Sequence, residues 1–281
     1  MSLSRLVPAD EALRIVLGGV TACGIEEVSL AQAAGRTVSQ DLEARRTQPP
    51  FDASAMDGYA VRQADILSLP AILNVVGHSR AGMPYGSGVG DQQAVRIFTG
   101  AVVPPGADSI IIQENTKATD DGRVRVLKGV EPGRFIRPAG LDFTSGEVLI
   151  HAGELLGPSR LALAASMNHA KITVFRKPRV ALITTGDELV MPGGETGAGQ
   201  IIASNTFGLM ASIENCGGVV IDCGIVEDTR EALQTAFEKA TASGADLIVT
   251  TGGASVGDHD LVLPVAQETG FDFRISKIAM R

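Results

Sequence analysis

The sequence has few cysteines, no long apolar run and no surplus of positive charge. Its three cysteines, Cys23, Cys216 and Cys223, are odd in number and lack metal-ligand spacing, which argues against a disulfide framework or a thiolate metal site. No apolar stretch approaches the length of a membrane span, and the first residues show no signal-peptide pattern. A net charge of −8 argues against a nucleic-acid surface. We therefore expect a cytoplasmic protein without a membrane or nucleic-acid partner.

The length and composition favour more than one folded domain. A chain of 281 residues exceeds an average domain, and a hydrophobic fraction of 44% supports real cores. The negative net charge does not exclude an anionic small ligand, because local loops and a metal ion can reverse the field.

The stretch ADLIVTTGGASVGDHD at 245–260 is the most informative part of the sequence. Its apolar run at 247–249 is typical of a parallel strand covered on both faces. Two threonines follow, and then small residues at Gly252, Gly253, Ser255 and Gly257. Glycines just past such a strand let backbone N–H groups approach a ligand, commonly phosphate, outside the carboxyl end of the sheet. An ordinary turn is the alternative interpretation of the glycines alone.

A second stretch, VALITTGDE at 180–188, also places Thr-Thr-Gly after an apolar strand. The two stretches predict neighbouring strands of one sheet with their loops on the same edge. From residue 179 onward strands and helices alternate, which predicts a doubly wound parallel sheet. We expect strands at 179–185, 218–225 and 246–251, and helices at 205–216, 229–242 and 260–269. Asn205 is expected to cap the first of these helices, and Asp228 or Thr229 the second.

The preceding part of the chain is predicted to be β-rich. Short apolar strands separated by glycine and proline are expected at 72–78, 94–98, 109–113, 124–127 and 148–150. Helical spacing predicts a helix within 6–20, and RRTQPP at 45–50 is typical of a linker. The expected fold class is α/β plus β, with the two parts in separate domains.

Five carboxylates lie in or beside loops at predicted strand ends, namely Asp57, Asp142, Glu188, Asp228 and Asp260. If they converge, their mutual repulsion requires a divalent cation or a basic ligand. Local capping is the alternative for Asp57 and Asp228, because aspartate commonly hydrogen-bonds nearby backbone in turns and at helix starts.

Several longer motifs resemble one family. FDASAMDGYA, RIFTGAVVPPGAD, LITTGDEL, GQIIASN, GIVEDT and VTTGGASVGDHD occur in the order found in the molybdopterin molybdenumtransferases. These are the enzymes of the last step of molybdenum cofactor synthesis and are related to the E domain of gephyrin. The resemblance covers nearly the whole chain, and none of its motifs is a lone glycine pattern.

The resemblance implies an enzyme that uses adenylated molybdopterin, molybdate and a magnesium ion, releases AMP and places molybdenum on the dithiolene sulfurs. It also implies an elongated homodimer, with a molybdopterin adenylyltransferase as upstream partner. The expected domains are an N-terminal helix packed on the sheet domain (1–26), an elongated linker domain (27–44 and 143–177), a β-rich domain (45–142) and a molybdopterin-binding α/β domain (178–281).

Carried onto this sequence, the resemblance implies a site whose two sides come from different subunits. One side holds Asp57, Thr99 and Asp142. The other side holds Glu188, Asp228, Asp260, Lys277 and Arg281. The five carboxylates are the expected catalytic residues, with Glu188, Asp228 and Asp260 as magnesium ligands. Substrate binding is assigned to Thr99, Gly186, Ser204, Asn205, Gly252, Gly253, Ser255, Gly257, Lys277 and Arg281.

The sequence departs from the family pattern at several positions. Ala53 stands where the family often has Asn, Ala203 where it has Ser or Asp, and Leu141 in a segment that is usually rich in arginine and acids. These changes bear on oxyanion contacts at those positions. The family continues past the position of Arg281 with a further strand, helix and β domain, so we expect a truncated chain.

Two other functions remain open from the sequence. A non-enzymatic scaffold is one, because the related gephyrin domain anchors receptors, although a scaffold would not need the five carboxylates. Adenylyl transfer is the other, from the 179–281 region alone, and the long β-rich region before it argues against this activity.

Overall fold

The computed structural model describes residues 6–252, 261–275 and 277–279. The chain divides into two compact units, one comprising 1–28, 33–39 and 173–281, and the other comprising 29–32 and 40–172. We call them the α/β unit and the β-rich unit. The finer division into four domains made from the sequence stays a prediction. Among the described residues, no helix is long and apolar enough to cross a membrane.

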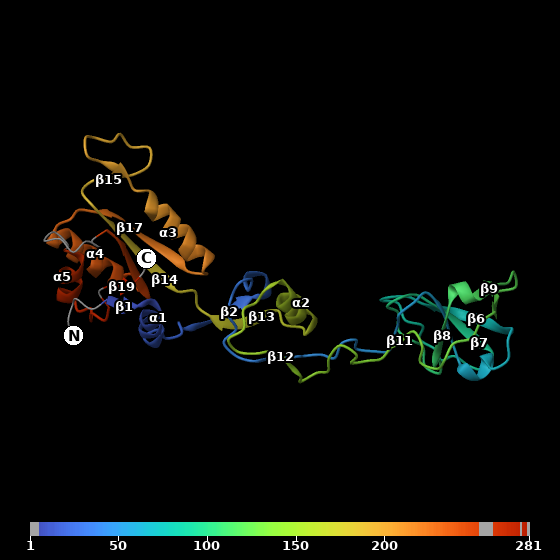
Figure 1. Cartoon of the computed structure of the whole chain (residues 1–281). Helices are drawn as coiled ribbons and strands as arrows, with labels where there is room; N and C mark the ends of the chain where they lie inside the picture. Colours follow the sequence, from blue (N-terminus) through green and yellow to red (C-terminus); the bar gives the residue numbers. More distant parts are fainter. Residues whose placement is uncertain (1–5, 253–260, 276, 280–281) are drawn as a thin grey trace. The chain divides into compact units, whose positions relative to one another are not determined.

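The α/β unit contains most of the helices (Figure 1). Its elements are β1 (Leu6–Pro8), α1 (Ala9–Gly18), β2 (Ile25–Ser29), β13 (Lys171–Phe175), β14 (Arg179–Thr185), β15 (Leu189–Val190), β16 (Ile201–Ile202), α3 (Ser204–Asn215), β17 (Val219–Val226), α4 (Arg230–Ala242), β18 (Leu247–Thr251), α5 (Val262–Glu268) and β19 (Lys277–Ala279). The unit boundary falls inside β2 and β13, along which the chain passes from one unit to the other.

The central sheet of this unit has the order β17-β14-β18, and both pairings are parallel. In the middle strand, Ala181 and Ile183 pack in one core cluster with Leu233 of α4 and Val265 of α5. Successive side chains of a strand point to opposite faces. Accordingly the next residue, Thr184, contacts α3 on the other face. Helices thus cover both faces of a parallel sheet (Figure 1), which confirms the predicted doubly wound architecture.

The helix starts agree only in part with the sequence prediction. Thr229 caps α4, because its side chain accepts a hydrogen bond from the Ala232 amide at 3.2 Å. The prediction that Asn205 caps α3 is wrong. That helix begins at Ser204, so Asn205 lies within its first turn, and Ala203 occupies the capping position without a side-chain hydrogen bond.

The N-terminal helix α1 follows the short strand β1, which pairs in parallel with β19. Ala12 of this helix is buried, whereas Leu13, Val16 and Leu17, apolar residues of the segment whose helical spacing predicted this helix, are more than half exposed. The pairing of β1 with β19 joins segments from opposite ends of the described chain.

The β-rich unit is built mainly from short strands. Its elements are β3 (Leu42–Glu43), β4 (Ala53–Ser54), β5 (Gly58–Val61), β6 (Ala71–Ser79), β7 (Gln93–Ile97), β8 (Ser109–Ile112), β9 (Thr116–Ala118), β10 (Arg123–Val126), β11 (Ile136–Arg137), β12 (Val148–Ile150) and α2 (Pro158–Ser166), with 3-10 turns at Leu30–Gln32, Gln63–Ile66 and Gln113–Asn115.

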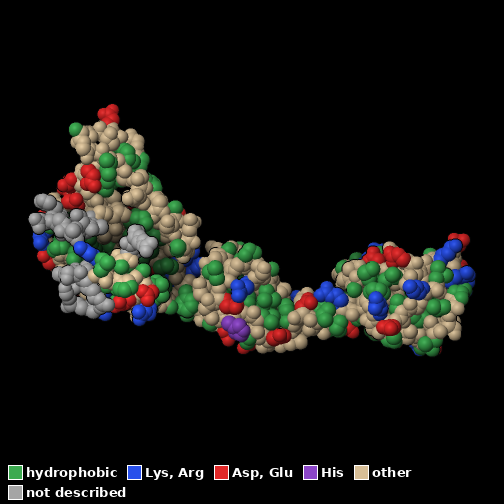
Figure 2. Space-filling view, viewed as in Figure 1, with side chains coloured by type: hydrophobic (Ala, Val, Ile, Leu, Met, Phe, Trp, Pro, Cys, Tyr) green, Lys and Arg blue, Asp and Glu red, His purple; other side chains and the backbone are tan. Residues whose placement is uncertain are grey.

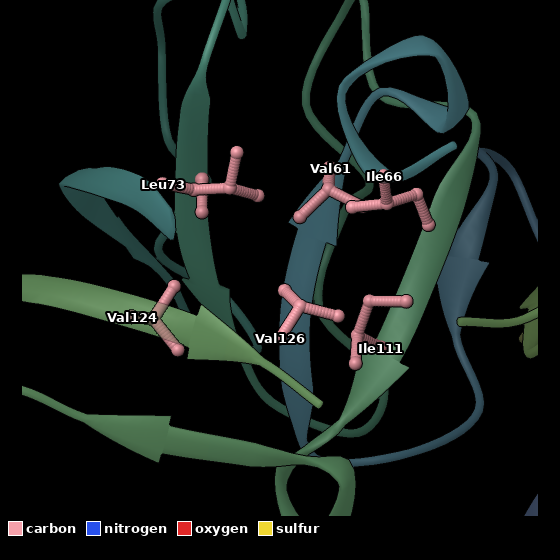
Figure 3. Packing of buried hydrophobic residues seen from close by; sticks show 7 residues of the cluster. Val61, Ile66, Leu73, Ile111, Val124 and Val126 are labelled. Carbon is pink, nitrogen blue, oxygen red and sulfur yellow. The ribbon is translucent and has the colours of Figure 1, made fainter. Parts of the chain in front are cut away.

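Six of these strands form one sheet with the order β8-β5-β7-β6-β10-β9, which is antiparallel except for the parallel β6–β7 pair. Both faces are covered at β5 and β8, because neighbouring residues in these strands belong to different core clusters. Val61 and Ile111 pack with Leu73 in one cluster (Figure 3). Ala60 and Ile110 pack in the other cluster.

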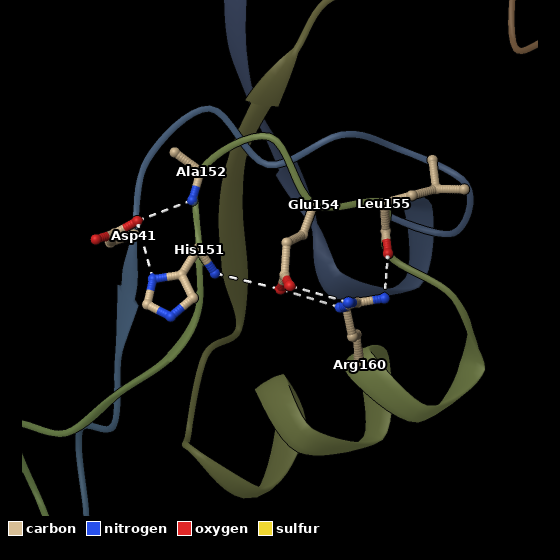
Figure 4. Close-up of polar contacts among 6 residues, drawn as sticks. All are labelled: Asp41, His151, Ala152, Glu154, Leu155 and Arg160. Carbon is tan, nitrogen blue, oxygen red and sulfur yellow. Dashed lines mark hydrogen bonds and ion pairs between the residues drawn. The ribbon is translucent and has the colours of Figure 1, made fainter.

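A polar network fixes the turn that leads into α2 (Figure 4). Glu154 accepts two hydrogen bonds from the guanidinium of Arg160, at 2.9 and 3.0 Å. It also accepts one from the His151 amide at 3.3 Å. The Arg160 bonds, followed by the His151 bond, lower the pKa of the Glu154 carboxyl. On the other side of the turn, the carboxylate of Asp41 accepts a hydrogen bond from the backbone amide of Ala152 at 2.8 Å.

Surface charges of both signs are interspersed on the face drawn in Figure 2. Ion pairs within one unit include Arg62–Asp91, Arg123–Asp121 and Arg230–Glu268.

Candidate functional site

The two Thr-Thr-Gly stretches lie side by side in the sheet. Strands β14 and β18 pair in parallel, with Ile183 opposite Thr250 and Thr184 opposite Thr251. The predicted neighbourhood of these stretches is therefore confirmed. Their following loops leave the sheet at the same edge, which is where open α/β sheets bind ligands.

Both glycines after these strands are required by the local geometry. Gly252 has a φ of +96°, and a Cβ added there would lie 2.3 Å from the carbonyl oxygen of Thr185. Gly186 has a φ of +150°, and a Cβ there would lie 2.6 Å from a carboxylate oxygen of Glu188. Side chains rarely adopt these backbone conformations, and here they would also collide with neighbours. At Gly252 the end of β18 therefore approaches the backbone of β14 as only glycine allows, whereas the neighbour of Gly186 is the movable end of the Glu188 side chain.

A cavity of about 220 Å³ opens at these strand ends. Four of the residues predicted from the sequence line it, namely Glu188, Ser204, Asn205 and Gly252. Four threonines that were not predicted as site residues also line it, namely Thr184, Thr185, Thr206 and Thr251. The sequence could have indicated Thr184, Thr185 and Thr251 as site residues, because they belong to the two Thr-Thr-Gly stretches, whereas nothing in the sequence marks Thr206.

The threonine hydroxyls organise the wall of this cavity. The hydroxyl of Thr184 is hydrogen-bonded to that of Thr206 at 2.8 Å, and both residues are buried. Thr185 donates a short hydrogen bond to the carboxylate of Asp228. The hydroxyl oxygen of Thr251 is buried and has no hydrogen-bond partner among the described residues. A buried hydroxyl without a partner costs free energy, so it is a natural point of contact for a bound ligand.

Glu188 and Asp228, two of the predicted acids of the α/β unit, both contact the segment 185–187. The Glu188 carboxylate lies against Gly186, and Asp228 is held by Thr185 and by its own amide, which donates to Asp187 at 3.1 Å. Carboxylate and hydroxyl oxygens are the donors that magnesium prefers. Within the described residues no group of three or more potential metal ligands is assembled. The predicted third ligand, Asp260, lies outside the described residues, so the metal site stays a prediction.

Two of the three residues predicted in the β-rich unit, Asp57 and Thr99, are hydrogen-bonded to each other. Oδ1 of Asp57 accepts hydrogen bonds from the amide of Thr99 at 2.8 Å and from its hydroxyl at 2.9 Å. The amide bond first, then the hydroxyl bond, lower the pKa of the Asp57 carboxyl below its ordinary value. Asp142 pairs with Arg137 at 3.1 Å. The structure thus connects Asp57 with Thr99 and places Asp142 beside a different partner.

The remaining predicted residues fall into two groups. Lys277 is exposed in β19, where it pairs with Leu6 of β1. Gly253, Ser255, Gly257, Asp260 and Arg281 lie outside the described residues.

A larger groove of about 880 Å³ lies along β17 and α4. Asp222, Cys223 and Lys239 are among its lining residues, and burial raises the pKa of the Cys223 thiol. Of the predicted site residues that the structure describes, none lines this groove. The smaller cavity is therefore the better candidate site.

These features define a class: a multi-domain protein whose doubly wound domain carries a ligand pocket at the carboxyl ends of its parallel strands. Residues 7–168 match the family model "MoeA N-terminal region (domain I and II)". Residues 181–281 match "Probable molybdopterin binding domain". The chain belongs to the molybdopterin molybdenumtransferase family.

Curated and solved relatives agree with this assignment. The chain is 38% identical to a molybdopterin molybdenumtransferase of Haemophilus influenzae, over 87% of this chain and 60% of that protein. It is 37% identical to one of Nostoc sp., over 91% of this chain and 59% of that protein. A crystal structure of a molybdopterin biosynthesis MoeA protein from Pyrococcus horikoshii superposes with a TM-score of 0.79 at 36% identity, covering 94% of this chain and 67% of that one. The chain thus spans about three fifths of the curated relatives it matches.

Proposed function

We propose that this chain belongs to an enzyme that inserts molybdenum from molybdate into adenylated molybdopterin and releases AMP. The observation that carries the proposal is the cavity at the ends of β14 and β18, which is lined by glycine, by threonines and by Glu188, with Asp228 bonded to the lining residue Thr185. Exposed backbone N–H groups and hydroxyls suit phosphate oxygens. The curated relatives carry the name of this enzyme, which favours it over a scaffold.

We propose Mg²⁺ as the metal of this site. The carboxylates of Glu188, Asp228 and Asp260 would hold the ion. A bound Mg²⁺ would polarise a phosphate group of the nucleotide-bearing substrate. The residues of the chain do the remaining work: the Thr185 hydroxyl orients the Asp228 carboxylate, and Gly252 lets the end of β18 lie against the carbonyl group of Thr185.

We further propose a cytoplasmic homodimer that receives its substrate from a molybdopterin adenylyltransferase. The family resemblance supports a site with Asp57, Thr99 and Asp142 from one subunit and the α/β residues from the partner, because C2 dimers often share residues across a two-fold axis. Lys277 and Arg281 are proposed to offset the charge of the anionic substrate.

The test of this function follows AMP release and molybdenum insertion. The purified chain is incubated with adenylated molybdopterin, molybdate and Mg²⁺, beside Asp228→Asn and an exposed control, Glu238→Gln. We expect molybdate-dependent AMP release by the parent and the control, and its loss in Asp228→Asn. Binding of the adenylated substrate without AMP release would contradict the enzyme and favour an interaction module.

A further inference from the structure

The side chain of Arg96 lies at the centre of the segments that carry Asp57 and Thr99. One guanidinium nitrogen donates to the carbonyl oxygen of Gly58, directly after Asp57, at 2.8 Å. The other donates to the side-chain oxygen of Gln113 at 2.8 Å. The amide of Gln113 in turn donates to the carbonyl oxygen of Asp57 at 3.1 Å. Arg96 therefore holds the backbone of Gly58 directly and is linked to the backbone of Asp57 through Gln113.

The same guanidinium also contacts the segment of Thr99. Its central carbon lies 4.9 Å from the ring centre of Phe98, the residue before Thr99, and 5.1 Å from the ring of Tyr59. Cation–π contacts of this kind favour a fixed orientation of a planar guanidinium. Arg96 is partly buried in β7, so its guanidinium group packs against the sheet and does not move freely in solvent.

The geometry leaves one oxygen of Asp57 for a ligand. Both donors of Thr99 go to Oδ1, and Oδ2 accepts no hydrogen bond from the described residues. For Oδ2 to face a constant direction, the segments of Asp57 and Thr99 must keep their relative position. The backbone of Gly58 lies close against β8, because a Cβ at this position would lie 2.0 Å from the carbonyl oxygen of Ile111.

We propose that Arg96 is a positioning residue, which fixes the Asp57–Thr99 pair by binding the segments on both sides of it. This proposal rests on the proposed function only in so far as Asp57 is taken to act on the substrate. Its immediate consequence is structural and can be measured without substrate: the Thr99 amide stays protected by its hydrogen bond to Asp57 as long as the guanidinium of Arg96 is in place. The Thr99 bonds lower the pKa of Asp57 most, and the charge of Arg96 adds a smaller contribution.

The test compares Arg96→Met, Arg96→Lys and Arg80→Met in the full chain. Arg80 lies 5.9 Å from the same Phe98 ring and is exposed, so its removal takes away an equal charge nearby. Amide hydrogen exchange is followed at Thr99, and the pKa of Asp57 is measured by 13C NMR. In Arg96→Met we expect about tenfold faster exchange at Thr99, with unchanged exchange in β10, and a rise in the Asp57 pKa.

The lysine variant separates positioning from charge. Lysine keeps the positive charge but lacks the planar guanidinium with its paired donors. The Asp57 pKa in Arg96→Lys should therefore lie between the values of the parent and Arg96→Met, whereas amide exchange at Thr99 should be as fast as in Arg96→Met. Arg80→Met should leave both at the parent values. Parent-like exchange at Thr99 in either folded Arg96 variant would overturn the proposal. If Arg96→Met does not fold, Arg96→Lys alone decides.

An activity measurement then separates this inference from the proposed function. If Asp57→Asn retains full AMP release, the role assigned to Asp57 in the reaction fails, whereas the exchange result still decides whether Arg96 positions the pair. If Asp57→Asn is inactive and Arg96→Lys lowers kcat with little change in KM, the positioning role extends to the reaction.

Discussion

The carboxylate of Asp246 accepts two hydrogen bonds from the guanidinium of Arg176, each 2.8 Å long. It accepts a third from the amide of Arg179 at 2.7 Å. Asp246 directly precedes β18, and Arg179 begins β14. One side chain thereby ties together the starts of two neighbouring strands whose opposite ends form the candidate site.

This arrangement predicts a pH-dependent contribution to stability. The Arg176 bonds, followed by the Arg179 bond, lower the pKa of the Asp246 carboxyl well below its ordinary value. Because the folded pKa is depressed, the contribution is fully present above the unfolded pKa of about 3.9 and is lost as the pH falls below it. Asp246→Asn should lower the free energy of unfolding at neutral pH by about 1 kcal/mol, since the pair is partly exposed.

Urea denaturation at neutral and acidic pH measures this effect. The gap between parent and Asp246→Asn should narrow in acid, whereas exposed Asp272→Asn should change little at either pH. A gap that stays constant would show that Asp246 does not stabilise the fold through its charge.

A second prediction compares two glycine-to-alanine variants, one that introduces backbone strain alone and one that also introduces a steric clash at the candidate site. Gly252 and Gly270 share a φ of +96°, but a Cβ added at Gly270 meets nothing within 4 Å. Gly270→Ala should therefore cost about 1 kcal/mol from strain alone. Gly252→Ala should cost clearly more, because the new methyl group would displace Thr185. Equal unfolding midpoints in urea for the two variants would contradict this close approach.

A third prediction concerns the hydroxyl pair in the cavity wall. Thr184→Val or Thr206→Val leaves the other buried hydroxyl without a partner and should cost about 1–3 kcal/mol. The double variant removes both hydroxyls at once, so its cost should be smaller than the sum of the single costs. Additive costs in the double-mutant cycle would mean that the two hydroxyls do not depend on each other.

A fourth prediction tests the cation. Calorimetric titration with Mg²⁺ in the presence of AMP should show weak binding, with water retained in the metal shell. Asp228→Ala should abolish the binding, while the matched control Glu238→Ala on the exposed side of α4 should leave it unchanged. Parent-like binding by Asp228→Ala would place the metal elsewhere.

The sequence predicted the α/β sheet well because its signals are local. An apolar run, two threonines and a glycine mark each of β14 and β18 and predict neighbouring strands, but the register is shifted by one residue from the motif alignment, with Thr184 opposite Thr251. The cavity lies at the ends of these two strands, so part of the site could be inferred from two short stretches.

Other features depend on contacts that no local pattern records. Thr206 reaches Thr184 only because α3 crosses that face of the sheet. The cap predicted at Asn205 failed because the helix begins one residue earlier, at Ser204. The three-residue strands β1 and β19 are too short to be recognised separately, since each is stabilised as a strand by the other.

The pairing of β1 with β19 also sets an order of events during synthesis. The β-rich unit is almost entirely contained within 40–172, so its contacts are available as soon as that segment has been made. The α/β unit begins earlier yet must wait for 277–279, and the N-terminal strand stays without its partner until then. Contacts so distant in sequence carry a high entropic cost of loop closure and form slowly. A folded insertion shortens the effective loop that must be closed before β1 and β19 can pair.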